Sequence, residues 1–150
     1  RWARRDIKST NLLAQVMAKH AANQAGAYEA LMVDDEGFVT EAGSSSFFFI
    51  KDNVLYVRPV SNEILHGITR QTMLRVAKER DISLIERNYT LDEVMAADEA
   101  LITASSIYVM PVGNIDGKRI GDGKAGAFTL ALREGYLAKA RAEFYTPKAS

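Results

Sequence analysis

Apolar residues recur along the chain with two periods, one typical of helices and one typical of strands. Spacings of three and four residues predict helices over residues 11–25, 69–80 and 126–144. The first of these segments has the pattern of an amphipathic helix. Its apolar side holds Leu12, Leu13, Val16 and Met17, and its polar side holds Gln15, Lys19, His20 and Gln24.

Shorter apolar or alternating runs predict strands between these helices. A further, short helix to about residue 97 is predicted by the capping-box spacing of Thr90 and Glu93. Asp116-Gly117 is typical of a hairpin turn. The predicted strands cover residues 29–33, 38–41, 47–51, 54–57, 83–89, 99–103 and 108–115.

This order of elements predicts an α/β or α+β fold. Strands in meanders with helices between them form a mixed, largely antiparallel sheet with flanking helices. No repeat, low-complexity tract or linker divides the chain, so we expect residues 1–150 to form a single domain. The chain does not begin with methionine, and we expect it to be part of a longer polypeptide.

Composition and charge exclude several classes of function. Nineteen basic and nineteen acidic residues cancel, so no basic field would attract nucleic acid. The absence of cysteine excludes thiolate chemistry and zinc–cysteine sites, and the two histidines have no partner pattern, so we expect no metal site. No apolar run reaches the roughly 18 residues of a membrane helix, and no targeting segment is evident. We therefore expect a cytoplasmic protein without membrane partners.

Two charged residues stand beside small or hydroxylated neighbours. Lys8 lies where a strand-like run meets the first helix, and partial burial or a nearby cation would lower its pKa and make it nucleophilic. Glu41 ends a predicted strand, and the small residues 42–46 after it leave room for a flat ligand. Taken alone, the first pattern also fits a solvated lysine, and the second also fits a strand that ends in a flexible polar loop.

Two further segments have groups that bind anions. Gly67 precedes a helix, and the N–H groups of Ile68, Thr69 and Arg70 are free to hold an anion there, although an ordinary threonine cap has the same sequence. Residues 102–107 place hydroxyls at the end of an apolar strand, which is also common at ordinary turns. Together, an amine, a carboxylate and two anion sites are what pyridoxal phosphate needs for its aldehyde, ring nitrogen and phosphate.

The order and sequence of these segments resemble the class IV (fold type IV) pyridoxal-phosphate aminotransferases. This superfamily includes D-amino-acid and branched-chain aminotransferases and aminodeoxychorismate lyase. The resemblance extends from residue 5 to about residue 144. It departs from the usual pattern at Ala42 and Ser46, where the family has Gly and Asn. The matching stretches are Asp6-Ile7-Lys8-Ser9 with Asn11-Leu12-Leu13, Tyr28-Glu29-Ala30 leading into Val39-Thr40-Glu41, Gly67-Ile68-Thr69-Arg70, Ile102-Thr103-Ala104-Ser105-Ser106, Met110-Pro111-Val112, Asp116-Gly117 and Gly121-Asp122-Gly123.

The resemblance implies a role for each site residue. Lys8 would form the Schiff base with the cofactor and then act as general base on the substrate Cα–H. Glu41 would keep the pyridine nitrogen protonated, and Leu65 would pack against the ring. Ser106 would line the substrate side. The phosphate would be held by Gly67, Ile68, Thr69 and Ser105.

The resemblance also implies an activity: transfer of an amino group from an amino acid, with D-amino acids favoured, to a 2-oxo acid. Branched-chain aminotransferase and aminodeoxychorismate lyase remain alternatives, and the lyase would release pyruvate without a 2-oxo acid acceptor. Family members carry an N-terminal domain that this chain lacks, so an isolated, non-catalytic domain with half a pocket is a further alternative. The family implies a homodimer with the site near the subunit interface.

Overall fold

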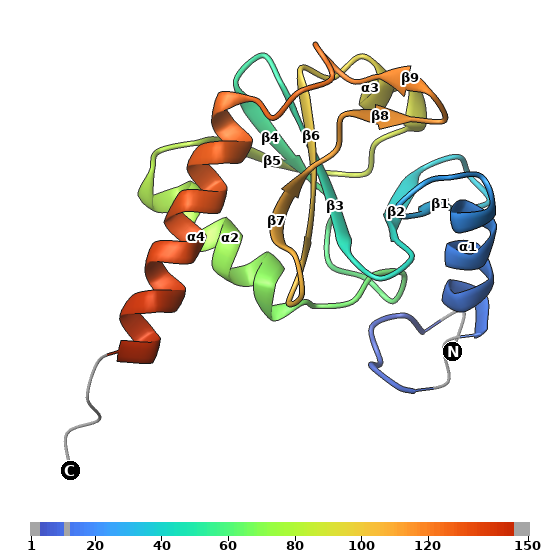
Figure 1. Ribbon diagram of the computed structural model, residues 1–150, viewed down its shortest axis with the longest axis horizontal. Helices are drawn as coiled ribbons and strands as arrows, with labels where there is room; N and C mark the ends of the chain where they lie inside the picture. The colour runs from blue at the N-terminus through green and yellow to red at the C-terminus, as the bar shows by residue number, and fades with distance from the viewer. Residues whose placement is uncertain (1–3, 11–12, 146–150) are drawn as a thin grey trace.

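A five-stranded sheet forms the centre of the computed structural model (Figure 1). The structure describes residues 4–10 and 13–145, and for residues 144 and 145 it describes the backbone alone. The strand order is β5-β4-β3-β6-β7. Only β4 and β5 pair in parallel, and the other pairs are antiparallel, so the predicted mixed, largely antiparallel sheet is confirmed. The strands are β3 Ser46–Lys51, β4 Val54–Val57, β5 Ser83–Glu86, β6 Glu99–Ala104 and β7 Tyr108–Pro111.

Helices α2 (Ile68–Glu79) and α4 (Ala127–Tyr145) cover one face of the sheet (Figure 1). Side chains alternate between the two faces of a strand, and Phe48 and Ile50 of β3 face this helical layer. Gly135 allows the two helices to pack closely, because a Cβ there would lie 2.4 Å from the Val76 side chain. The buried members of this core are Phe48, Ile50, Leu55, Val57, Met73, Val76, Ala77, Leu101, Val109 and Leu132.

The opposite face of the sheet packs against a smaller layer of strands and a short helix. Phe47 and Phe49 of β3 point to this side, and the buried Tyr89 hydroxyl donates to the Phe47 carbonyl at 2.9 Å. The ring of Tyr89 also meets the Phe49 ring edge-on, with centroids 5.0 Å apart. The elements of this layer are β1 Leu31–Val33, β2 Val39–Ala42, α3 Leu91–Met95, β8 Asn114–Ile115 and β9 Lys118–Arg119.

Most predicted elements are confirmed, and the three long predicted helices correspond to α1 (Leu13–Gln24), α2 and α4. The capping box also forms, because the Glu93 amide donates to Thr90 Oγ1 at 3.3 Å and the Thr90 amide to Glu93 Oε2 at 2.9 Å. No helix in the described part of the chain is long and apolar enough to cross a membrane.

The single strand predicted over 108–115 is wrong, because the chain breaks into β7 and β8 at Val112 and Gly113. The Val112 amide still bonds the Ala100 carbonyl at 2.8 Å, but Gly113 packs directly against the backbone of Gly123. The strand predicted over 83–89 ends at Glu86, since the chain then turns Tyr89 into the core. The strand predicted over 29–33 begins only at Leu31.

Helix α1 turns Gln15 of its polar side inward, contrary to what an amphipathic pattern indicates, whereas His20 and Gln24 of the same side are exposed. Gln15 is buried, whereas Leu13, Val16 and Met17 are each more than half exposed. Leu12 lies outside the described residues. The contact is made where Gly43 approaches α1, because a Cβ at that glycine would lie 2.9 Å from Lys19 Cγ. The polar side of α1 therefore lies against the loop after β2.

Candidate active site

A cavity of about 560 Å³ lies where five segments of the chain meet, four of which carry predicted site residues. The segment 4–10 brings Lys8 to it, β2 brings Glu41, the loop before α2 brings Leu65, and the end of β6 brings Ser105. All seven residues predicted to contact a cofactor line this one cavity, whereas Ser106, predicted on the substrate side, lies in the following turn outside its lining. The seven are Lys8, Glu41, Leu65, Gly67, Ile68, Thr69 and Ser105.

Lys8 lines the cavity with an exposed side chain. The described residues therefore do not provide the partial burial that would make the amine nucleophilic. The segment that carries it is nevertheless fixed, because the Arg5 amide donates to the Asn62 carbonyl at 2.7 Å. The Arg5 guanidinium also donates to Thr40 Oγ1 at 2.8 Å. The lysine is thus held against the strand that carries Glu41.

Glu41 is buried on β2 and has a defined orientation. The main-chain amide of Leu65 donates to Glu41 Oε2 at 2.9 Å. This contact ties the carboxyl group of Glu41 to the loop before α2. The carboxylate lines the same cavity as Lys8.

Helix α2 begins at the cavity, and no backbone acceptor among the described residues bonds the amides of Ile68, Thr69 and Arg70. Gly67 is the residue before the first turn, has extended backbone angles, and makes no side-chain capping bond. The threonine cap, which the sequence allowed as an alternative, is therefore not formed, because Gly67 holds the cap position and Thr69 lies inside the first turn. Unpaired N–H groups at a helix start, together with the helix dipole, favour an anion. Residues 67–70 all line the cavity.

Two buried polar atoms on the cavity wall have no hydrogen-bond partner among the described residues. They are Oε1 of Gln15 and Oγ1 of Thr103, and both side chains are more than nine-tenths buried. Leaving such an atom unsatisfied is unfavourable, so a polar ligand in the cavity would relieve the cost. The sequence placed Gln15 on the polar side of α1 and gave no signal that it lies in a site.

Glu29 holds the small-residue loop that closes one side of the cavity. Its carboxylate accepts from the Ser44 hydroxyl at 2.7 Å and from the Ser44 amide at 3.2 Å. A Cβ at Gly43 would lie 2.9 Å from Glu29 Oε1, so the loop can approach only with glycine at that position. The sequence motif contained Glu29, but its spacing did not indicate this contact.

A second cavity of about 590 Å³ lies between α1 and strands β6 to β8. It is lined mainly by apolar residues, including four alanines of the segment from Ala18 to Ala25. None of the residues predicted to contact a cofactor or substrate lines it, and its lining includes no lysine. Of the two cavities described, only the one of about 560 Å³ contains both Lys8 and the start of α2.

The sequence of residues 1–115 matches the family model for amino-transferase class IV. The chain belongs to this family. Among curated members, it is 46% identical over 129 residues to a D-alanine aminotransferase of Bacillus licheniformis, covering 86% of this chain and 45% of the relative. It is 43% identical over 136 residues to the D-alanine aminotransferase of Staphylococcus haemolyticus, covering 91% and 48%. The chain spans about half the length of the curated class IV aminotransferases that it matches.

Solved structures of class IV aminotransferases share this fold. The T.th. branched-chain amino acid aminotransferase complexed with 4-methylvaleric acid superposes with a TM-score of 0.85 at 38% identity, over 91% of this chain and 48% of that one. The same enzyme complexed with N-(5'-phosphopyridoxyl)-L-glutamate gives a TM-score of 0.81 at 40% identity, over 85% and 42%. The holo-form enzyme from Thermobaculum terrenum gives 0.86 at 29% identity, over 95% and 48%.

Proposed function

We propose that this chain is the cofactor-binding part of a pyridoxal-phosphate aminotransferase that transfers the amino group of an amino acid to a 2-oxo acid. The observation that carries the proposal is one cavity lined by Lys8, Glu41 and the uncapped start of α2. Membership of the class IV family supports it. So does the T.th. branched-chain relative, which was solved in complex with a phosphopyridoxyl-glutamate.

The residues of the cavity fit pyridoxal phosphate as a ligand. The free amides and the Thr69 hydroxyl at the start of α2 suit a phosphate, and Ser105 adds a second hydroxyl. Glu41 suits a protonated ring nitrogen, and Leu65 offers an apolar contact to the ring face. The Thr103 hydroxyl and the Gln15 side-chain carbonyl, which have no partner in the described part of the chain, are available for a polar ligand.

Each protein group has a separate chemical task. Bound pyridoxal phosphate supplies an aldehyde for the amino group and a ring that accepts electron density. The Lys8 amine would hold the cofactor aldehyde, and the same amine would take the proton from the substrate Cα. The ionised Glu41 keeps the ring nitrogen protonated, which matters most when negative charge develops. Ile68 and Thr69 would hold the phosphate. Ser106 would line the substrate side, as the resemblance implies, from the turn just outside the cavity lining.

A D-amino acid is the substrate class that we favour. The relatives that support it are D-alanine aminotransferases at 46% and 43% identity. A branched-chain L-amino acid is the second candidate, because the T.th. branched-chain enzyme has the same fold at 38% identity. Release of pyruvate without a 2-oxo acid acceptor would instead indicate aminodeoxychorismate lyase.

We propose that the complete protein acts as a homodimer in the cytoplasm. Residues 1–150 would form one domain of each subunit. The exposed apolar side of α1, with Leu13, Val16 and Met17, supports a partner on that side. The curated relatives are about twice as long as the stretch they share with this chain, which supports a second domain that completes the site.

The proposal is tested by the absorbance of lysine-bound pyridoxal phosphate in the complete protein. We expect the band in the wild type and in Lys124→Ala, a control at a lysine outside the cavity lining, and its loss in Lys8→Ala. Addition of D-alanine should convert the band more readily than a branched-chain L-amino acid. A Lys8→Ala protein with normal band and turnover would overturn the proposal.

A further inference from the structure

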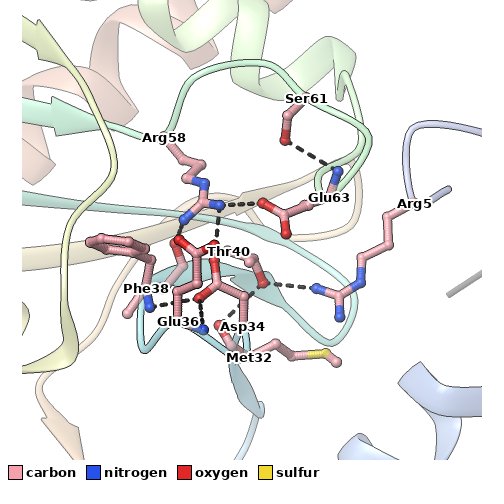
Figure 2. A network of polar contacts seen from close by, with 10 residues as sticks. Arg5, Met32, Asp34, Glu36, Phe38, Thr40, Arg58, Ser61 and Glu63 are labelled. Carbon is pink, nitrogen blue, oxygen red and sulfur yellow. Dashed lines mark hydrogen bonds and ion pairs between the residues drawn. The ribbon is translucent and has the colours of Figure 1, made fainter. Parts of the chain in front are cut away.

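Arg58 is a buried arginine that no motif contains, and it joins three segments near the cavity. Its guanidinium donates to the Val39 carbonyl on β2 at 3.1 Å and to Asp34 Oδ2 in the β1–β2 turn at 3.1 Å. It also pairs with the Glu63 carboxylate in the loop before α2. Figure 2 shows these carboxylates converging on the guanidinium from different sides. The side chain of Arg58 is only 4% exposed.

Arg58 holds the loop from Arg58 to Gly67 at its start and at its middle. At the start, the carbonyl of Arg58 accepts from the buried Arg70 side chain of α2 at 2.9 Å. Further along, Glu63 binds the guanidinium two residues before Leu65. Leu65 is the residue whose amide donates to Glu41. Arg58 therefore sets where the Leu65 amide stands relative to the Glu41 carboxylate.

The same loop also holds the segment that carries Lys8. The Asn62 carbonyl, next to Glu63, accepts from the Arg5 amide at 2.7 Å. The Arg5 guanidinium reaches Thr40 Oγ1, which itself donates to the Met32 carbonyl at 3.2 Å (Figure 2). Strand β2, which carries Glu41, and the 4–10 segment, which carries Lys8, therefore both contact the loop that Arg58 holds.

Electrostatic interactions keep the Asp34 carboxylate charged near neutral pH, so its ion pair with Arg58 is maintained. Burial opposes ionisation of Asp34, yet hydrogen bonds from the Phe38 amide and from Arg58 hold the pKa of this carboxyl below its ordinary value. An arginine presents five donors in a planar fork, whereas a lysine offers one compact charge. A lysine at position 58 would therefore retain the charge but could not bond Val39, Asp34 and Glu63 together.

We propose that Arg58 is a positioning residue for the cofactor site, acting through Glu63 and β2 on the Glu41–Leu65 contact. The inference rests on the proposed function, and it is separate from the family motifs. Arg58 does not line the cavity, so it has no direct contact to offer a ligand there. Its effect should appear as cofactor affinity and as the protonation behaviour of the bound cofactor.

The test compares Arg58→Met, Arg58→Lys and Glu63→Gln in the complete protein, with Arg80→Met as the control. Arg80 pairs with Glu134 at 3.2 Å on the exposed side of α2 and α4, away from the cavity. Three quantities are measured for each variant. They are thermal unfolding without cofactor, the dissociation constant of added pyridoxal phosphate, and the pH at which the bound-cofactor absorbance changes.

We expect Glu63→Gln to weaken cofactor binding about tenfold, because it removes the charge from the hydrogen bond that Arg58 donates. Arg58→Met should weaken binding more strongly, because it removes every hydrogen bond of the guanidinium. Arg58→Lys should fall between Arg58→Met and the wild type. The absorbance midpoint should shift in the Arg58 and Glu63 variants and stay in place in Arg80→Met. If Arg58→Met does not fold, Glu63→Gln decides, since its side chain is 45% exposed and only its charge changes.

Two contrary results have different meanings. If the wild type binds pyridoxal phosphate and folded Glu63→Gln matches it in affinity and absorbance midpoint, the positioning role is overturned and the proposed function stands. If the wild type itself binds no pyridoxal phosphate, the proposed function fails, and the inference fails with it.

Discussion

The main-chain amide of Leu65 and the carboxylate of Glu41 are joined by a 2.9 Å hydrogen bond across the cavity wall. They are 24 residues apart in the chain. Glu41 is therefore oriented by a backbone group, which cannot move as freely as a side chain. A preorganised carboxylate costs little reorganisation when charge develops on a bound ring, and this is the role that we propose for Glu41.

Glu41→Gln should separate binding from catalysis. Glutamine keeps the shape and can still accept from the Leu65 amide, but it carries no charge to hold a ring proton. We expect cofactor binding to change little and kcat to fall by about a hundredfold or more. Steady-state kinetics with D-alanine, alongside a cofactor titration, measures both. An unchanged kcat would show that the ring-nitrogen role is wrong.

Gly43→Ala and Gly135→Ala form a pair that distinguishes the site from the core. A Cβ at Gly43 would meet Glu29 and Lys19 at 2.9 Å, and one at Gly135 would meet Val76 at 2.4 Å. We expect each to lower the free energy of unfolding by about 1–3 kcal/mol. Only Gly43→Ala should also weaken cofactor binding, because its loop lines the cavity. Equal cofactor affinities in both variants would contradict this account of the loop.

The motifs of the sequence predicted a set of groups that the fold brings to one cavity, and the role of each group stays a prediction. Lys8, Glu41 and Thr69 were each placed by local spacing and by the resemblance, and the fold brings them to one cavity. The sequence did not predict Arg58, because its partners lie in three segments that only the fold brings together. Local patterns carry no information on such pairings.

The face of α1 was predicted wrongly for a related reason. The amphipathic pattern indicates that apolar residues face inward, but Gln15 is the buried residue and Met17 is exposed. Helix periodicity identifies two sides of a helix without saying what each side meets. The break after β7 was missed as well, since the close approach of Gly113 and Gly123 is a tertiary contact.

Met17→Glu tests whether the exposed side of α1 is covered by a second copy of the protein. Met17 is 59% exposed, so a charge there should leave the fold of one chain intact. We expect the variant to shift the sedimentation behaviour of the complete protein from dimer towards monomer. Leu130→Glu, at a residue of α4 that is 52% exposed, is the control and should leave the mass unchanged. A Met17→Glu protein that stays dimeric would exclude this face.

Glu93 should make stability depend on acid pH. The Arg87 guanidinium, and next the Thr90 amide, hold the pKa of the Glu93 carboxyl below its ordinary value. A depressed pKa stabilises the fold above the unfolded-state value, and this contribution is lost as pH falls through the folded-state value. Glu93→Gln keeps a capping-box residue but removes the charge.

The difference in unfolding free energy between wild type and Glu93→Gln is then largest near neutral pH. It should be under about 1 kcal/mol, because the pair is partly exposed, and should shrink below about pH 4. Urea unfolding at several pH values measures it. A difference that is constant with pH would contradict the role of the charge.

The central claim is that Lys8, Glu41 and the start of α2 hold one molecule of pyridoxal phosphate. Borohydride reduction of the cofactor-loaded complete protein, followed by peptide mass spectrometry, tests it most directly. We predict that the reduced cofactor is found on the peptide containing Lys8 and on no other lysine. Its recovery on a different lysine, or on none, would contradict the account.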